Sequence, residues 1–464
     1  MGFRSEDKKT SPRAMMPTAE LFVGSAAAVA SACAAAGGGL YSPMLGANLL
    51  LAGAGFIATS RMTLAMRASF VKARLCGIDL NKPGTKRDAS GALVVPIEGP
   101  VIPEAMGLIA GCVYLTVMFI FIPFAFMREQ VASQWGGAPV LSKYLSALLA
   151  ICCMCFLGFA DNVLDLRWRD KLWLPLTASL PLLMVYAVDG GSTTVLLPPL
   201  LAQSLAPWVG ITSVNIGLAY YAFMASLAIF CTNAINILAG VNGLEVGQSV
   251  VIALTIAVNN CIQLHRWPSP TSALHQNNLF SLSLILPFIG CSLALLVHNW
   301  HPAKVFVGDT YCYFAGMTFA VSAILGHNAK TMLLFFLPQI VNFVYSCPQL
   351  FKLIPCPRHR MPGYDQPTDR LILSWCEFEP KALGLGGKLI YATIRCLGLA
   401  RIEALDEGKV RMSNLTLINY ALMVLGPMHE ARLTSALLIL QGASSVLALL
   451  VRYQLAGYFY EVLK

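Results

Sequence analysis

Long apolar runs, separated by polar segments, recur along nearly the whole chain. A transmembrane helix needs about twenty apolar residues, whereas a strand of an outer-membrane barrel shows an alternation of about ten residues. The runs fit the helical pattern. They predict transmembrane helices at residues 46–68, 105–126, 141–160, 172–188, 216–235, 247–264, 279–297, 311–325, 331–350 and 432–452. The predicted fold class is an all-α polytopic membrane protein with about ten transmembrane helices.

The first residues precede this pattern and have a different character. An alanine-rich run at residues 18–36 follows the polar start MGFRSEDKKTSPR. Three interpretations stay open for this run: an eleventh span, a cleaved signal, or a poorly ordered extension. We assign residues 1–44 to an extension associated with the membrane, and residues 45–464 to the transmembrane domain.

Composition agrees with a membrane protein and excludes a water-soluble one. Of the 464 residues, 57% are hydrophobic and 12% are charged, and the mean hydropathy is +0.66. A soluble domain has too little interior to bury that much apolar surface. The formal net charge of +9 comes from Lys and Arg between the apolar runs, so it indicates membrane orientation and phosphate ligands, with no nucleic acid as a partner.

The segments between the predicted spans form two sets, which lie on opposite sides of the membrane if the spans alternate. One set has only Arg128, Arg266 and Lys330 as cations. The other set holds nearly all the remaining Lys and Arg, and consists of residues 69–104, 161–171, 236–246, 298–310 and 351–431. The excess of cations places this second set in the cytosol.

The longest of these segments, residues 351–431, is too long for a simple turn. We expect it to form a small cytoplasmic subdomain inserted between the last two spans. Its stretches LILSWCEF and KLIYATIRCL fit either strands or an interfacial helix, and the sequence does not decide between them.

Unusual polar clusters all fall in the cation-rich set. The stretch LGFADNVLDLRWRDKL, residues 157–172, carries Asp161, Asp165 and Lys171 between two apolar runs. Charged groups next to hydrocarbon are expensive unless they are paired or serve a site. Asn236 and Asn242 lie in CTNAINILAGVNGLEVGQS, residues 231–249.

Two further stretches of the same set complete the candidate chemistry. HNWHPAKVFVGDTYCYFAGM, residues 298–317, places Phe306 three residues before Asp309 at a predicted helix start. IPCPRHRMP, residues 354–362, holds Arg358, His359 and Arg360 between prolines, and such a cluster favours a bound anion. A solvated basic loop and a helix N-cap remain the alternatives for these two stretches.

These residue types indicate a class of ligand. Carboxylate and amide oxygens without thiols favour Mg²⁺ or Mn²⁺ over Zn²⁺. The nearby cations and the aromatic ring fit a nucleotide with its phosphates. A membrane enzyme so equipped joins a nucleotide-activated group to a lipid phosphate.

Four stretches, in this order and spacing, resemble a known family. FADNVLDLRWRDKL, CTNAINILAGVNGLE, VFVGDTYCYFAGMTFAV and PCPRHRMP are similar to the eukaryotic UDP-GlcNAc:dolichyl-phosphate GlcNAc-1-phosphotransferases, within glycosyltransferase family 4. The resemblance covers about residues 45–464. It implies a multi-pass enzyme of the endoplasmic reticulum membrane with a cytosolic active site. It also implies UDP-GlcNAc and dolichyl phosphate as substrates, Mg²⁺ as cofactor, and transfer of GlcNAc-1-phosphate as the first step of lipid-linked oligosaccharide synthesis. We also expect a homodimer.

The resemblance further implies roles for individual residues. Asp309 and Asn236 would hold the metal, and Phe306 would stack on uracil near Asn242. The implied catalytic residues are Asp161, Asn162 and Lys171. The other implied substrate-binding residues are Asp79, Leu80, Asn81, Lys82, Glu104, Asp165, Trp168, Arg358, His359 and Arg360.

The chain departs from the family at one of these positions. The family usually has two adjacent aspartates where this chain has Asp161 and Asn162. We expect a carboxylate at position 162 to increase the rate. Three alternatives to the active enzyme stay open: a catalytically impaired variant, a non-catalytic relative that binds lipid-linked sugar, and a lipid-sugar transporter or flippase. A transporter predicts polar residues at mid-span that are accessible from both sides.

Overall fold

A computed structural model describes residues 43–80, 82, 85, 97–126, 138–164, 166–167, 171, 173–189, 191–196, 213–357 and 360–455 of the chain. Nearly all of the predicted N-terminal extension therefore lies outside the described residues. The same holds for five candidate site residues: Asn81, Asp165, Trp168, Arg358 and His359.

Each predicted span coincides with a helix of the structure. The helices are α2 (Pro43–Lys72), α3 (Gly107–Phe126), α5 (Ala138–Leu164), α7 (Trp173–Val188), α9 (Leu218–Ile237), α10 (Leu244–Arg266), α11 (Ala273–Asn299), α12 (Gly308–Leu325), α13 (Ala329–Phe335), α14 (Leu337–Leu350) and α17 (Glu430–Leu450). The predicted span 331–350 is split, because α13 and α14 meet at a bend of 70°. Residues Val451–Leu455 continue α17 as a π-helical turn.

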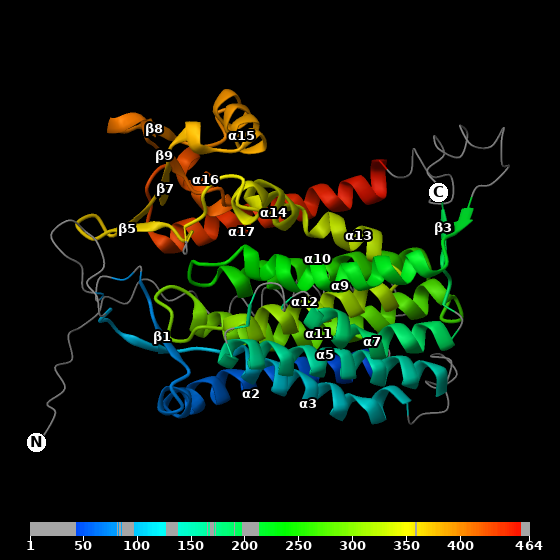
Figure 1. Ribbon diagram of the computed structural model, residues 1–464. Helices are drawn as coiled ribbons and strands as arrows, with labels where there is room; N and C mark the ends of the chain where they lie inside the picture. The colour runs from blue at the N-terminus through cyan, green and yellow to red at the C-terminus, as the bar shows by residue number, and fades with distance from the viewer. Residues whose placement is uncertain are drawn as a thin grey trace, which may run out of the picture.

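These helices make the chain a polytopic membrane protein. In the described part of the chain, seven helices are long and apolar enough to cross a membrane, or eight if the bent pair counts as one span. α7 is apolar but shorter. The long helices run side by side, as Figure 1 shows.

The centre of the bundle is formed by α11 and α12. α12 packs against α5 and α9, while α11 packs against α2 and α10. Both helices are apolar around most of their circumference, which is typical of helices buried on all sides. Phe288 of α11 contacts the rings of Phe314 and Phe319 of α12, with centroids 5.4 and 5.1 Å apart. This packing fixes where α12 begins, and the candidate site lies at that point.

Short antiparallel strand pairs lie at both ends of the bundle. β1 (Cys76–Ile78) pairs with β2 (Val101–Pro103), and β5 (Gly363–Asp365) pairs with β6 (Arg370–Ile372), at the end that we call the loop-rich end. β7 (Trp375–Phe378), β9 (Val410–Ser413) and β8 (Ile402–Ala404) form a three-stranded sheet in that order beyond β5. The opposite end carries the pair of β3 (Thr194–Leu196) and β4 (Ser213–Asn215).

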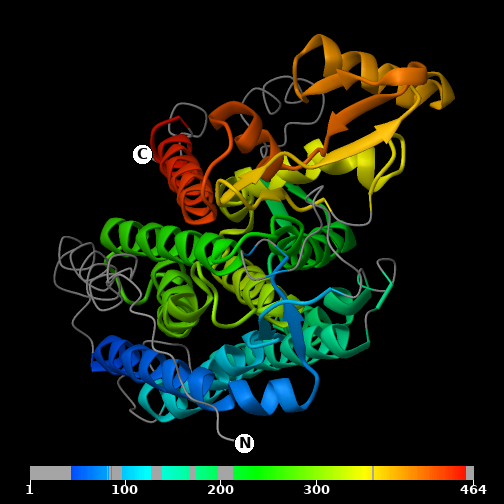
Figure 2. The same ribbon diagram turned by 90° about the vertical axis from the view of Figure 1, so that its left-hand side faces the viewer.

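The two ambiguous stretches of the long insertion adopt different structures. LILSWCEF forms β6 and β7, whereas most of KLIYATIRCL belongs to a helix, α15 (Leu385–Cys396). Short 3₁₀ turns at Pro380–Ala382 and Asp406–Gly408 and helix α16 (Leu417–Leu425) complete the insertion. Ile354, Cys376, Ile394 and Met412 belong to a hydrophobic cluster of its own. Seen from the loop-rich end, these elements lie beside the helices of the bundle (Figure 2).

Candidate active site

A pocket of about 750 Å³ lies at the loop-rich end. Its wall combines β1, the end of α9, the loop between α9 and α10, the residues that lead into α12, and the starts of α16 and α17. The lining includes ten predicted residues or their direct neighbours: Asp79, Leu80, Glu104, Lys171, Asn236, Asn242, Phe306, Gly308, Asp309 and Arg360. Segments far apart in the sequence therefore meet where the sequence predicts a common face.

Lys171 connects two carboxylates, Asp309 in the lining of the pocket and Asp161 outside that lining. Its Nζ lies 2.7 Å from Oδ2 of Asp309 and 2.9 Å from Oδ2 of Asp161. The Asp161 side chain is fully buried, while those of Lys171 and Asp309 keep 20% and 24% of their surface exposed. Tyr313, one turn after Asp309, donates a second hydrogen bond to Asp161 Oδ2 at 2.8 Å. The buried carboxylate is thus fully engaged, while Asp309 faces the pocket.

Burial alone would lower the pKa of the Lys171 ammonium, because the charged form loses water. The hydrogen bonds and charges of Asp309 and Asp161 outweigh this effect and raise the pKa of Lys171 above its ordinary value. Lys171 is therefore a permanent cation at neutral pH. Burial, and then the charge of Asp309, raises the pKa of Glu104 on the pocket wall.

Asp309 also meets an amide from the end of α9. Asn236 Nδ2 donates to Asp309 Oδ1 at 2.9 Å, and both residues line the pocket. The pair offers one carboxylate and one amide oxygen. Mg²⁺ commonly binds through one or two protein oxygens and takes its other ligands from water and phosphate. This donor set therefore fits Mg²⁺. Among the described residues, there is no cluster of three His, Cys, Asp or Glu side chains able to hold a metal without such help.

Asn162 is directed at the start of α12. Its Oδ1 accepts hydrogen bonds from Thr310 N at 2.9 Å and from Thr310 Oγ1 at 2.7 Å. Gly308, with φ of +67°, precedes these contacts, and a Cβ there would lie 2.7 Å from Asn162 Oδ1. Only glycine adopts this backbone conformation without strain while leaving room for the amide. Asn162 therefore positions the turn that carries Asp309.

Phe306 is held by the backbone on both sides. Its N–H donates to Pro103 O at 2.8 Å, and its carbonyl accepts from Met106 N at 3.1 Å. Its ring lies 3.7 Å from where a Cβ of Gly77 would be. The ring thus occupies a fixed place on the pocket wall.

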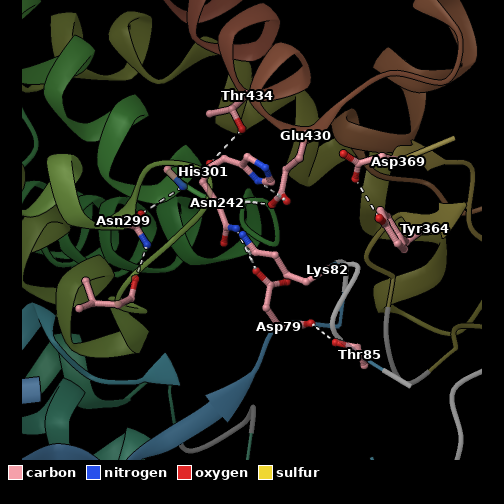
Figure 3. A network of polar contacts seen from close by, with 12 residues as sticks. Asp79, Lys82, Thr85, Asn242, Asn299, His301, Tyr364, Asp369, Glu430 and Thr434 are labelled. Carbon is pink, nitrogen blue, oxygen red and sulfur yellow. Dashed lines mark hydrogen bonds and ion pairs between the residues drawn. The ribbon is translucent and has the colours of Figure 1, made fainter. Parts of the chain in front are cut away.

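A polar network secures Asn242 beside the pocket (Figure 3). Asn242 Nδ2 donates to Asp79 Oδ2 at 2.9 Å, and its backbone N–H donates to Glu430 Oε1 at 2.7 Å. Glu430 Oε2 lies 3.0 Å from His301 Nδ1. Thr434 Oγ1 donates to the Asn242 carbonyl at 2.9 Å. The first turn of α17 therefore holds the loop between α9 and α10 in place.

Asp79 has a second partner in this network. Lys82 Nζ lies 3.4 Å from Asp79 Oδ2, and both side chains are about nine-tenths buried. Thr85 Oγ1 donates to the Asp79 carbonyl at 2.7 Å. Asp79 and Leu80 line the pocket, whereas Lys82 acts on it through Asp79.

Arg360 approaches the pocket from the insertion. Its carbonyl accepts from Asn419 Nδ2 at 3.1 Å, which fixes the backbone. Its Nη1 is buried and has no hydrogen-bond partner among the residues that the structure describes. Burial lowers the pKa of this guanidinium, although it stays charged. Arg360 lines the pocket, and a guanidinium N–H without a partner is a ready donor for an anionic ligand.

Some residues of the site were missed by the sequence interpretation. Glu430 and Tyr313 contact predicted residues directly but were not candidates. Tyr313 follows Asp309 by four residues and so shares its helical face, a spacing that could have found it. Glu430 is a lone carboxylate at the start of a span, which is a weaker signal. His298 and His301 serve separate contacts, with Ser60 Oγ and Glu430, both at 3.0 Å, so they do not form a shared site.

Comparison with known proteins finds relatives along most of the chain. A sequence model described as glycosyl transferase family 4 matches residues 144–327. A Saccharomyces cerevisiae protein named UDP-N-acetylglucosamine–dolichyl-phosphate N-acetylglucosaminephosphotransferase is 45% identical over 446 residues, which cover 90% of this chain and 95% of the yeast protein.

Two further proteins carry the same name. The one from Schizosaccharomyces pombe is 41% identical, with 90% of this chain and 94% of the relative covered. The one from Dictyostelium discoideum is 43% identical, with 82% of each chain covered.

Proposed function

Because the chain belongs to the family of UDP-N-acetylglucosamine–dolichyl-phosphate N-acetylglucosaminephosphotransferases, we propose that its pocket catalyses the reaction for which these relatives are named. The chain transfers GlcNAc-1-phosphate from UDP-GlcNAc to dolichyl phosphate and releases UMP. The product, GlcNAc-diphosphodolichol, opens lipid-linked oligosaccharide synthesis for N-glycosylation.

One observation of the pocket carries this proposal. Lys171 bridges Asp161 and Asp309, next to the amide of Asn236. Both substrates are anions, so their mutual repulsion opposes the approach of one phosphate to another. The ammonium of Lys171, together with the metal ion that Asp309 and Asn236 would hold, would offset that repulsion where the phosphates meet.

The reaction is a displacement at phosphorus. An oxygen of dolichyl phosphate attacks the β-phosphorus of UDP-GlcNAc and forms a new P–O bond. The bond from the β-phosphorus to the bridging oxygen breaks, and that oxygen leaves with UMP. A phosphate monoester is already ionised near pH 7, so the attacking oxygen needs no strong general base.

We assign Asp309 and Asn236 as the residues that would hold Mg²⁺, or Mn²⁺, against the pyrophosphate. The ion supplies charge neutralisation for the phosphate oxygens when bound. Lys171 keeps Asp309 oriented and stays close enough to contact the same oxygens. Asp161, with Asn162, fixes Lys171 and the start of α12. Of the three residues assigned as catalytic, Lys171 would contact the substrate, whereas Asp161 and Asn162 position Lys171 and the start of α12.

The other residues of the pocket wall would bind the uracil and the sugar phosphate of UDP-GlcNAc. Phe306 would stack on the uracil, with Asn242 and the Asp79–Leu80 edge of β1 nearby. Glu104 lines the same pocket. Arg360 would meet the sugar phosphate, together with Arg358, His359 and Trp168, while Asn81, Lys82 and Asp165 would complete the substrate contacts.

Purified protein incubated with radiolabelled UDP-GlcNAc, dolichyl phosphate and Mg²⁺ tests the activity. We expect UMP release that depends on both substrates, and a labelled lipid product. A transporter or a non-catalytic binder would release no UMP. Polar side chains of three helices, Gln248, Gln339 and Gln441, also argue against a transporter. Gln339 Nε2 donates to each of the other two at 2.7 Å, so these groups bind one another and not a transported ligand.

Orientation is the next part of the proposal. We infer that all ten predicted spans cross the endoplasmic reticulum membrane and that the loop-rich end faces the cytosol, as the cation-rich segments indicate. Single-cysteine labelling of the segment 351–431 in sealed microsomes should succeed from outside. Labelling that needs permeabilised membranes would contradict this orientation. We also propose a homodimer, which mass measurement of the purified protein tests.

Arg360→Ala should weaken binding of UDP-GlcNAc by about tenfold to 100-fold, because a hydrogen bond to a charged group is lost. Binding of UMP should change much less, since the guanidinium is assigned to the sugar phosphate. Arg370→Ala, on the exposed surface of β6, is the matched control. Equal losses for both ligands would place Arg360 at the nucleotide instead.

Asn162→Asp should increase the initial rate at least about tenfold. The carboxylate keeps both hydrogen bonds from Thr310 and adds negative charge at the N-terminus of α12, beside the metal ligand Asp309. Rates of the two proteins are compared at matched Mg²⁺ and pH. Indistinguishable rates would show that residue 162 acts through its hydrogen bonds with Thr310 and not through charge.

A further inference from the structure

Helix α15 has two apolar faces, and the residues that the structure describes cover only one of them. Gly387 and Ile394 are buried against the insertion. Tyr391 contacts Phe378 of β7, with ring centroids 5.8 Å apart. This inner face explains how α15 is attached to the three-stranded sheet.

The opposite face carries an exposed apolar stripe. It consists of Leu385, Leu389, Ala392 and Cys396, whose spacings of four, three and four residues place them on one side of the helix. Leu385 is 89% exposed and Leu389 is 71% exposed. Large apolar side chains on the face opposite a protein core need another apolar environment.

Apolar side chains are also exposed on the bent span and on the segment that follows it. Val344 of α14 and Phe351 just beyond it are 62% and 59% exposed. Leu353 follows, and its carbonyl lies 2.4 Å from where a Cβ of Gly387 would be, so α15 abuts this segment directly. Figures 1 and 2 both place α15 on the outer side of the bundle, beyond α14. Exposed apolar side chains therefore occur on α14, on the segment that follows it and on α15, which abuts that segment.

Cations flank the stripe. Lys388 and Arg395 are exposed and seven residues apart, so they lie on the same side of the helix next to the stripe. α15 itself contains no acidic residue. An apolar stripe flanked by cations is typical of a helix that lies in the interface of a membrane with anionic lipids.

We propose that α15 lies in the membrane interface at the loop-rich end, with its stripe among the lipid chains and Lys388 and Arg395 at anionic head groups. A second copy of the chain fits less well. Four side chains cover far less than the roughly 800 Å² that each partner buries in a stable complex. A two-fold axis at the stripe would also bring the cations of both copies together. Docking of α15 in the interface anchors the insertion, and with it Arg360, at the membrane depth where the phosphate of the lipid substrate lies.

Photo-crosslinking of the full chain in lipid nanodiscs tests this proposal. Leu389→p-benzoylphenylalanine should give phospholipid adducts, detected by mass spectrometry, at a yield at least about fivefold above that of Ala404→p-benzoylphenylalanine. Ala404 is exposed on β8 and serves as the matched control. Equal yields at the two positions, or a crosslinked pair of chains at residue 389, would overturn the proposal.

A charge variant tests the head-group contact. Combining Lys388→Glu and Arg395→Glu should lower the adduct yield at residue 389 about threefold or more in discs with phosphatidylserine, and less in discs of phosphatidylcholine alone. Unchanged yields in both lipids would contradict a role for the cations. Thermal unfolding midpoints of all variants confirm that they are folded, and Ala392→p-benzoylphenylalanine replaces the residue 389 variant if that protein is unstable. These readouts do not depend on the transferase activity.

Discussion

Asp309→Asn is expected to reduce turnover at least about 1000-fold, because the change removes the one charged metal ligand assigned to the site. Asp309 is also the acceptor for Lys171 and Asn236, so an amide at this position loses the ion pair as well as the metal. The measurement is the initial rate of UMP release at saturating Mg²⁺.

Two controls make this result specific. Asp406→Asn alters an exposed carboxylate of the insertion and should leave the rate unchanged. Unfolding midpoints of both variants should remain close to that of the parent chain. A near-normal rate for Asp309→Asn at high Mg²⁺ would refute the metal assignment.

Lys171→Met is expected to reduce the rate at least about 100-fold and to destabilise the protein by about 3 kcal/mol, because removing one partner of a buried ion pair leaves the other uncompensated. The fully buried Asp161 would lose its cation and face Asp309. Lys143→Met is the matched control. Its ammonium lies 3.6 Å from Asp189 in a more exposed pair at the opposite end, where the effect on stability should be below about 1 kcal/mol.

The stability contributed by Lys171 depends on pH in a defined direction. Its pKa in the folded protein is raised, so the contribution is complete below the ordinary lysine pKa of about 10.4 and is lost as pH rises through the raised value. The difference in unfolding free energy between the parent chain and Lys171→Met should thus be constant near neutral pH and shrink in strong alkali. A difference that grows with alkaline pH would contradict the ion-pair assignment.

The sequence predicted the helices well because hydrocarbon demands long apolar runs, and few other segments meet that demand. It also predicted that Lys171, Asn236 and Asp309 would meet, since the positive-inside rule assigned their segments to one side of the membrane. Their pairing within that side could not be predicted. Which carboxylate Lys171 contacts depends on how α5, α9 and α12 pack, and periodicity alone does not specify packing.

Other features of the site depended on contacts between distant segments. Position 162 was considered for the charge that an aspartate would supply there, but the two hydrogen bonds that Asn162 accepts at the start of α12, 148 residues later, were not predicted. Glu430 was missed because its partner Asn242 lies 188 residues earlier. The stretch KLIYATIRCL was ambiguous because isoleucine, tyrosine and threonine favour strands, while the spacing of its apolar residues fits a helix.

The hydrogen bonds that join Glu430 and Thr434 to Asn242 have a consequence for biosynthesis. α17 is the last of the described helices to leave the ribosome, yet its first turn contacts the loop between α9 and α10 that lines the pocket. A nascent chain that has inserted the earlier helices still has the Asn242 backbone N–H without its carboxylate acceptor. Insertion of α17 therefore completes this side of the pocket, and a chain stalled before residue 430 would lack the contacts that hold Asn242.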